Sequence, residues 1–535
     1  MGKHNKAVFS FTAALLIFSM TLTLFLFSTT VKAAILGPKY YYLSVEKNNF
    51  KGLETKYKDF LKQNYLKESS YACKANAMIG GDIVKSDPSI QKVADFFSKF
   101  ELGINYNTNY KDLKDGFYTA LLSAKYDGKP LGSVDIKSAD NKTLIAFPEL
   151  TEKTFGIEST DVSTTFYEAL LGDDQAFKKL FGITRDTYDN MVERYLKDVI
   201  FEQIPDDNVV FNQDAVFENI KCNSITFKID QKVASNIYRS VAKELENDKD
   251  FKTFLYSLSK AVMDSAKIDT ESRLTITQEE IDKEIKSMCE QLNDEADNME
   301  EVQLEYTAYF NNSDDILSRQ INDKLSNVNA TLSIYKNQSG VDILNLLYQE
   351  DGKTEFELSN ELKFLNGSIF NGNFNIDVEG KSLLEAQYTY DKLGQAGGLS
   401  AFVGQVDGKV HMDQFNNSDF SGDSSLSDIT FSFSNQKKDN DTLVGNAKVN
   451  TQIDGKSMDI TVMTEVKQSD KAISKPQVSI EDSIKMTDYE KLDEMMNEIK
   501  DSLSKKLPEL FPASDDEDNF NGNFKDNFVI EPSEF

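Results

Sequence analysis

The chain has 535 residues, of which 40% are hydrophobic and 27% charged, and its formal net charge is −29. This composition describes a folded protein with more than one packed unit and excludes an intrinsically disordered chain. A surface of that sign repels nucleic acid and anionic lipid headgroups, which argues against both as electrostatic partners.

The N-terminus carries the features of an export signal. Two lysines precede a run of 25 uncharged residues, 7–31. Val31 and Ala33 fit the small-x-small pattern that signal peptidase recognises, so 1–33 is predicted to be a signal peptide. Because the run is long enough to span a bilayer, an uncleaved membrane anchor is the alternative. Both predict an extracytoplasmic protein, either secreted or held at the cell membrane by this segment.

The first element after this signal is predicted to be a helix. Apolar residues recur at steps of three, four and seven between Leu43 and Leu61, with Lys and Glu between them. The next stretch, Tyr71 to Ile79, has apolar or small residues at alternate positions, which is typical of a half-buried strand. Four more strands are predicted near 100–109, 116–126, 130–137 and 142–147.

The middle of the chain changes to the period of helices. Tyr188 to Val199 and Val233 to Leu245 each have one apolar face. Between them, Ile220 to Ile229 has the pattern of an isolated strand that could join a neighbouring sheet. Thr277 and Glu280 form a capping box, which predicts the start of a third helix.

From about residue 301 the sequence alternates in the manner of strands. Five acid-Gly-Lys tripeptides punctuate the chain, and an acid followed by Gly favours a two-residue type I′ turn between antiparallel neighbours. The prediction is a meander of roughly ten strands. The tripeptides are Asp127-Gly-Lys129, Asp351-Gly-Lys353, Glu379-Gly-Lys381, Asp407-Gly-Lys409 and Asp454-Gly-Lys456.

The end of the chain is predicted to be a polar loop, a closing helix and a tail. The loop covers 416–428, and Thr487 with Glu490 forms a second capping box. The helix that follows has one apolar face and is expected to end before Pro508. The acidic segment 513–535 is predicted to be disordered.

The fold class predicted from these elements is α+β. A large antiparallel β-meander, forming a curved sheet or half-barrel, should pack on helices. Residues 40–300 are predicted to form an α+β lobe with an N-terminal helix, hairpins and a helical insertion. Residues 301–512 are predicted to form the meander with its closing helix.

No motif in the sequence predicts chemistry. The chain has two histidines, and only His411 lies outside the N-terminal signal, which indicates a structural or surface role for it. No Gly-rich loop follows a strand, so no nucleotide cofactor is implied. With 88 acidic residues, the sequence does not single out a catalytic pair of carboxylates. We therefore predict no catalytic, cofactor-binding or metal-binding residue, and no enzyme.

Three cysteines, Cys73, Cys222 and Cys289, are an odd number and too few for a disulfide scaffold. A single bridge between Cys73 and Cys222 is conceivable, because both lie in strand-like stretches. Three buried thiols are the alternative, since free Cys behaves as a small hydrophobe. Their spacing does not resemble a zinc site.

Taken together, the hydrophobic N-terminus, the helix from Tyr40 to Leu66, the strand from Tyr71, the repeated hairpins and the late helix resemble a known family. It is a family of secreted or membrane-anchored proteins of clostridia and related Gram-positive bacteria, defined as a domain of unknown function. The order of elements is also similar, more loosely, to half-barrel lipoprotein carriers, in which a curved sheet and helices enclose an apolar cavity. The chain differs from those carriers in its greater length and in lacking a cysteine for lipid attachment.

Three functions follow as hypotheses. The first is an extracytoplasmic binding protein that holds an apolar or lipid ligand against a curved sheet. The second is a non-enzymatic scaffold or interaction protein of the cell envelope with a filled core. The third, ranked last, is an exported hydrolase that depends on carboxylates. A cavity beside the sheet would favour the first hypothesis and a filled interior the second.

Overall fold

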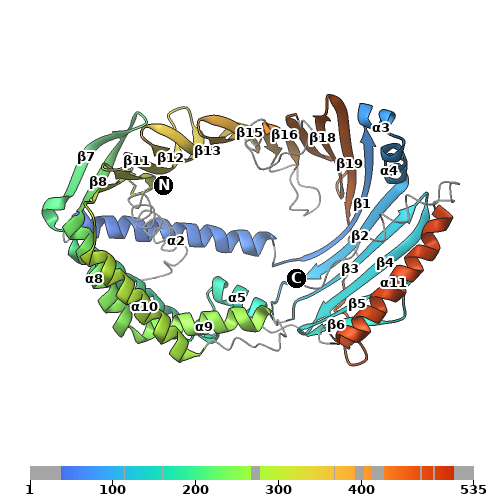
Figure 1. The fold of residues 1–535 in the computed structure, drawn as a ribbon, viewed down its shortest axis with the longest axis horizontal. Helices are drawn as coiled ribbons and strands as arrows, with labels where there is room; N and C mark the ends of the chain where they lie inside the picture. The colour runs from blue at the N-terminus through green and yellow to red at the C-terminus, as the bar shows by residue number, and fades with distance from the viewer. Residues whose placement is uncertain are drawn as a thin grey trace.

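The computed structural model shows a single large sheet that curves around a set of helices (Figure 1). The described residues are 38–64, 66–113, 115–158, 162–266, 277–311, 313–366, 368–391, 403–412, 427–469, 473–485 and 488–510. The predicted signal with Val31 and Ala33, most of the polar loop, Thr487 and the acidic tail lie outside these residues.

All 20 strands belong to one sheet. The first group is β1 (Glu68–Gly80), β2 (Phe100–Asn109), β3 (Phe117–Tyr126), β4 (Lys129–Ala139), β5 (Lys142–Ala146), β6 (Thr154–Glu158), β7 (Val209–Phe217) and β8 (Ile220–Asp230). The second group is β9 (Gln303–Phe310), β10 (Ile316–Asp323), β11 (Val328–Lys336), β12 (Val341–Glu350), β13 (Lys353–Asn366), β14 (Ile369–Val378) and β15 (Lys381–Asp391). The last strands are β16 (Gly404–Val410), β17 (Ile429–Lys437), β18 (Thr442–Ile453), β19 (Lys456–Gln468) and β20 (Ile484–Lys485).

The strand order joins the two halves of the chain. Strands β7 to β19 pair consecutively and antiparallel, as a meander. The early strand β1 then pairs with β19 on one side and β2 on the other, and the order continues through β3, β4, β5 and β6. Only β20 is parallel to its neighbour, β6. The sheet therefore runs across the predicted boundary at 300/301, with β8 beside β9 and β1 beside β19.

The helices occupy two regions. Helix α2 (Pro38–Asn64) runs beneath the arch of the sheet, and α5 lies near its C-terminal end (Figure 1). A group of helices closes the far side: α5 (Val162–Leu171), α6 (Asp174–Phe181), α7 (Arg185–Arg194), α8 (Gln231–Asn247), α9 (Lys249–Ala266) and α10 (Gln278–Asp297). Three helices accompany β1 to β6, namely α3 (Asp82–Ser86), α4 (Pro88–Lys99) and α11 (Tyr489–Leu510).

Four of the five acid-Gly-Lys turns are confirmed. Asp127, Asp351, Glu379 and Asp454 have φ between 47° and 52°, and the glycine after each also has positive φ. The fifth prediction is wrong, because Asp407 and Gly408 lie inside β16 and pair with its neighbours on both sides. The ring of Phe431 from β17 occupies the space above Gly408 where a side chain would stand. Tertiary packing thus places this tripeptide in a strand.

Most other predicted elements are confirmed, including the long N-terminal helix, the strand from Tyr71 and the capping box at Thr277. Two details are wrong. The strand 220–229 is not isolated, because β7 precedes it and a turn at Glu218 and Asn219 makes the two a hairpin. The closing helix does not end before Pro508 but continues to Leu510.

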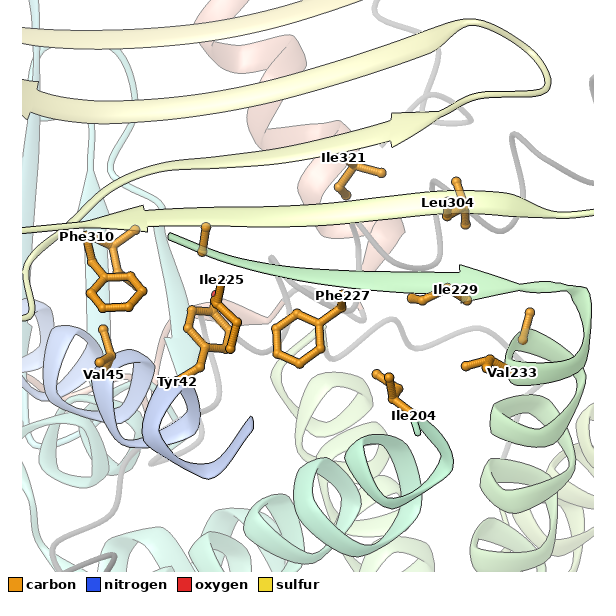
Figure 2. Close-up of a cluster of buried hydrophobic side chains, with 13 residues drawn as sticks. Tyr42, Val45, Ile204, Ile225, Phe227, Ile229, Val233, Leu304, Phe310 and Ile321 are labelled. Carbon is orange, nitrogen blue, oxygen red and sulfur yellow. The ribbon is translucent and has the colours of Figure 1, made fainter. Parts of the chain in front are cut away.

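The main core lies where β8, β9 and β10 face α2 and α8. Its most buried side chains are Ile225, Phe227 and Phe310, which point from the sheet toward Tyr42 and Val45 of α2 (Figure 2). These five side chains are at most 3% exposed. Burial of this kind contributes about 25 cal/mol per Å² of apolar surface, so this cluster anchors α2 to one end of the sheet.

Candidate ligand-binding face

Strand register places the apolar residues of distant strands on one side of the sheet. One row of directly paired residues runs across seven strands without a charged side chain. We call the side that bears it the apolar face. The row is Phe374, Ala386, Gly408, Phe431, Val449, Ile460 and Ile79.

The adjacent row, one residue along each strand, belongs to the other side and is polar throughout. Because side chains alternate between the two sides, the sheet is amphipathic over this whole width. The polar row is Asn375, Glu385, Lys409, Thr430, Asn450 and Asp459.

Helices cover the apolar face at its two ends. At β8 to β10 it is covered by α2 and α8, through the core cluster described above. At the other end, Phe96 of α4 stacks on Phe100 and Tyr126, and Phe155 of β6 packs against the α11 cluster.

Between these ends the same face is uncovered in the described structure. In β12 to β19, Ala386 and Leu443 are the only buried hydrophobic residues among those described. Val378, Phe433 and Val449 are 37–38% exposed. Further along, Leu102 and Ile104 of β2 are 46% and 39% exposed. An exposed apolar surface that crosses so many strands is a candidate binding surface.

Two aromatic rings on this face lie over glycines of neighbouring strands. The ring of Tyr388 lies over Gly372 on the neighbouring strand, as that of Phe431 does over Gly408. The Tyr388 hydroxyl donates a hydrogen bond of 2.8 Å to Asn360 Oδ1. Glycines within strands mark places where a sheet bends or another group approaches closely. Here they let rings lie across the strands.

Helix α2 has two different halves. In the first half, Asn49 bridges to the sheet, donating to the Asp314 carbonyl at 2.6 Å and accepting from the Ile316 amide at 3.1 Å. At 100° per residue, Leu53, Tyr57 and Phe60 fall on the same side of the helix as Asn49. They are 52%, 49% and 52% exposed. The side of α2 that packs on the sheet in its first half therefore carries three exposed apolar side chains in its second half, next to the exposed Lys56.

The opposite side of α2 is fixed to the helical group. Lys47 Nζ lies 3.3 Å from Glu193 Oε2 of α7, and Arg185 lies near Glu54. The first contact fixes the first half of α2 to the helical group, and the second fixes its second half. Helix α2 as a whole runs beneath the arch of the sheet (Figure 1).

A half-buried ion pair lies where the covered part of the face ends. Arg319 of β10 donates to both carboxylate oxygens of Glu46 on α2, at 2.9 and 2.6 Å. The hydroxyls of Tyr42 and Tyr306 meet beside it at 2.6 Å. Burial and the Glu46 carboxylate raise the pKa of Tyr306 above its ordinary value. This polar group orients α2 on the sheet.

At the start of β1 and the end of β2, tyrosines gather at one border of the apolar face. The rings of Tyr106 and Tyr118 lie 6.4 Å apart, and Tyr110 follows directly after β2. Burial, then the neighbouring Tyr106, Tyr118 and Tyr167 of α5, raise the pKa of Tyr110 to about 12. The Tyr110 amide bonds to the carbonyl of Lys67 at 3.2 Å, which places Lys67 at the same border.

A polar pocket of about 400 Å³ opens at the ends of β10, β11 and β12. Its lining is mostly carboxamide, and Asn329 donates to Gln349 at 3.2 Å within it. Asn329 and Gln349 pair directly on the side of the sheet opposite the apolar face. The pocket is therefore separate from that face.

The structure places His411 after β16, near two carboxylates. Its Nε2 lies 3.3 Å from Glu385 and its Nδ1 3.5 Å from Asp428, while Lys409 also contacts Asp428 at 2.6 Å. Within the described residues, no group of three potential ligands could hold a metal ion. The three cysteines are free thiols, with Cys222 and Cys289 buried and Cys73 half-buried, so the bridge weighed from the sequence does not form.

Sequence reasoning identified strands with one apolar side but no site residue on them. The uncovered part of the face was not predictable, because a period of two also describes a plain core. The tyrosines near 106–118 were a usable signal that was missed. They lie close together in the sequence and alternate with the strand period.

Comparisons with known proteins show no family for this chain. No protein-family model matches the sequence, and no curated protein matches it. Solved structures that match include a mutant of Rh. blastica porin, with 8% identity, a TM-score of 0.20, and coverage of 75% of this chain and 99% of that chain. A crystal structure of Pseudomonas aeruginosa OccK5 (OpdH) matches with 8% identity, a TM-score of 0.18, and coverage of 76% and 99%. Among the described helices, none is both long and apolar enough to cross a membrane.

Proposed function

We propose that this protein is an extracytoplasmic binding protein that holds the acyl chain of a lipid. The chain would lie between the apolar face and the second half of α2, inside a curved sheet of the half-barrel kind. The observation that carries the proposal is the uncovered apolar face of β12 to β19, where Ala386 and Leu443 are the only buried hydrophobic side chains among the described residues.

An acyl chain suits this surface for three reasons. The face is long and runs across strands, which fits an extended molecule better than a compact one. It has no charged side chain along its central row, so an apolar chain meets no unpaired charge. Each methylene removed from water contributes about 0.8 kcal/mol, so a ligand of ordinary acyl length is stabilised by burial alone.

The second half of α2 supplies the opposing wall. Leu53, Tyr57 and Phe60 are each about half exposed, and they fall on the side of the helix that packs on the sheet in its first half. A soluble protein rarely leaves two apolar surfaces uncovered across one space. A ligand that fills the space would cover both at once.

The direct test is native mass spectrometry of the full chain purified from its own cells, before and after organic extraction. We expect a stoichiometric lipid mass that extraction removes. A bare polypeptide mass would contradict the proposal and favour the envelope scaffold. The same spectrum shows whether the chain begins at Met1 or after Ala33, which tests the proposed export signal.

Cys73 provides an internal reporter for the same proposal. It lies on the apolar face, paired with Val466 and Ile104, and is half-buried, while Cys222 and Cys289 are 2% and 4% exposed. We expect a maleimide to label Cys73 in extracted protein and to label it at least fivefold more slowly after palmitate is added. Equal labelling rates with and without palmitate would count against ligand on this face.

A matched pair of variants locates the ligand. Val449→Gln places a polar group on the apolar face, whereas Lys448→Gln changes the neighbouring residue on the opposite side. We expect the first to weaken palmitate binding roughly tenfold and the second to leave it unchanged, because only Val449 touches the proposed space.

A further inference from the structure

The apolar face is wider than the one row of paired residues described above, which we call the central row. Two further rows of directly paired residues flank it, each two residues along the strands, and neither contains a charged side chain. Over β14 to β17 the three rows run side by side. The first flanking row is Leu332, Leu346, Leu358, Ile376, Leu384, Val410 and Ile429. The second flanking row is Leu362, Gly372, Tyr388, Val406, Phe433, Ala447, Val462 and Ala77.

The side chains of the three rows are accessible over their whole length. Ala386 is the only one of them that is buried, and Phe433 and Val449 are each 37% exposed. Pairing continues the central row from Phe374 through β13 and β12 to Ile334 of β11, which is 55% exposed. The accessible apolar surface therefore extends in two directions, across the strands and along them.

Ion pairs form the border of this surface toward β10 and β11. The first flanking row is continued by Arg319, which is paired with Glu46 of α2. The second is continued through Asp342 to Lys336, whose Nζ lies 3.0 Å from Asp342 Oδ1. Because each of these charges has its own partner, an apolar ligand that reaches the border meets no unpaired charge.

The rows are longer than one acyl chain. Seven neighbouring strands are separated by six spacings of about 4.8 Å, so each row extends about 29 Å along the sheet. An acyl chain fills one leaflet of a bilayer, which is about half of the ~30 Å hydrocarbon core, so it extends about 15 Å. The flanking rows lie about 6.6 Å to either side of the central row. One acyl chain would therefore cover about half of one row and leave the rest of the face in water.

We propose that the apolar face holds at least two acyl chains at once, so that the ligand is a diacyl lipid or a pair of single-chain lipids. A second chain that lies beside or beyond the first removes further apolar surface of the protein from water, which is the driving force for binding. This inference deepens the proposed function, names the class of ligand, and rests on that function.

The test counts the palmitate molecules that bind to the extracted full chain at saturation, by native mass spectrometry. We expect at least two per protein. Ile334→Gln and Val449→Gln place polar groups seven strand spacings apart, about 34 Å along the sheet, which is further than one chain reaches. Each variant should lower the count by one, and the double variant should lower it by two. Lys448→Gln, on the opposite side of the sheet, should leave the count unchanged.

The outcomes separate this inference from the proposed function. Saturation at one palmitate per protein, or a count of two or more that neither variant lowers, would overturn the inference. Saturation at one palmitate that Val449→Gln weakens would leave the proposed function intact. Failure of palmitate to bind at all would overturn the proposed function itself.

Lipid extracted from the natively purified protein distinguishes the two sources of acyl chains. One diacyl lipid per protein would support a diacyl ligand, and two single-chain lipids per protein would support a pair of them. One single-chain lipid per protein would contradict the inference.

Discussion

Two regions of one sheet, β8–β10 and β12–β18, have the same alternation of apolar and polar residues and different surroundings. In the first, Ile225 and Phe310 are fully buried against α2. In the second, Phe433 and Val449 on the same face are 37% exposed. The strand pattern is thus the same in a filled core and an open face, and the difference comes from what lies against it.

Helix α2 shows the same contrast along its own length. Tyr42 and Val45 in its first half are 3% and 0% exposed, while Leu53 and Tyr57 in its second half are about half exposed. Both halves keep an apolar side in the same direction. The first half is held to the sheet by packing, and the second half is fixed on the opposite side by Arg185 near Glu54. The open region therefore has fixed walls, which a binding site requires.

The largest expected effect comes from emptying the covered region. Phe310→Ala removes a ring that is 0% exposed, so the free energy of unfolding should fall by about 3–5 kcal/mol. Phe433→Ala on the open region should cost about 1 kcal/mol in extracted protein, because much of its surface is already in water. Urea unfolding of both variants measures the difference.

If Phe310→Ala and Phe433→Ala lower the free energy of unfolding equally, the open region must be packed in solution, and the contrast between the two regions would be wrong. If added palmitate stabilises the wild type by more than it stabilises Phe433→Ala, the result would support the open region as the place where the ligand binds. A ligand that binds only the folded state raises the free energy of unfolding in proportion to its affinity, so loss of a ligand contact appears directly in this assay.

The strands themselves were largely predictable, because alternation and turn chemistry are local. Asp351-Gly and Glu379-Gly make the expected turns, since both positions must have positive φ and little else in the neighbourhood competes. Asp407-Gly has the same composition and lies in a strand, because Phe431 packs over Gly408. A local rule fails where a distant residue uses the glycine for close approach.

The pairing of β1 with β19 was not predictable for a different reason. It joins Cys73 near the start of the chain to Val466 near its end, and no local pattern encodes that choice. Helix α4 was a missed opportunity, since Asp87 before Pro88 is a helix-start signal that the structure uses as a cap. The candidate site depends on the pairing of β1 with β19, because β1 continues the row of apolar residues beyond β19.

A smaller effect is expected in the helical group that supports α2. Asp189 of α7 is 7% exposed, and within the described residues its Oδ1 has no hydrogen-bond partner. Burial raises its pKa to about 7; Arg185 opposes the rise, while Asp186 and Glu54 add to it. The folded state then holds a proton that the unfolded chain releases near pH 4. Stability should therefore fall as pH rises from about 4 to 7.

Asp189→Asn removes this titration. We expect the variant to have a flatter stability profile between pH 5 and 8, and to gain about 1–3 kcal/mol at pH 8. Urea unfolding at several pH values measures both. Asp186→Asn, on the same helix and exposed, should only reduce the slope, because Asp186 adds to a rise in pKa whose largest cause is the burial of Asp189. An unchanged slope in Asp189→Asn would show that the support of α2 does not depend on this proton.

The smallest effect on stability, and the most selective one on binding, is expected from the open half of α2. Leu53→Ser and Tyr57→Ser should each change the free energy of unfolding by less than about 0.5 kcal/mol, because both side chains are already about half in water. Bound acyl chain would lose contacts with the opposing wall, so its dissociation should accelerate several-fold. Lys62→Ser, on the far side of the same helix, controls for the loss of helix propensity. If all three variants released ligand at the same rate, the second half of α2 would be only a strut, and the sheet alone would form the site.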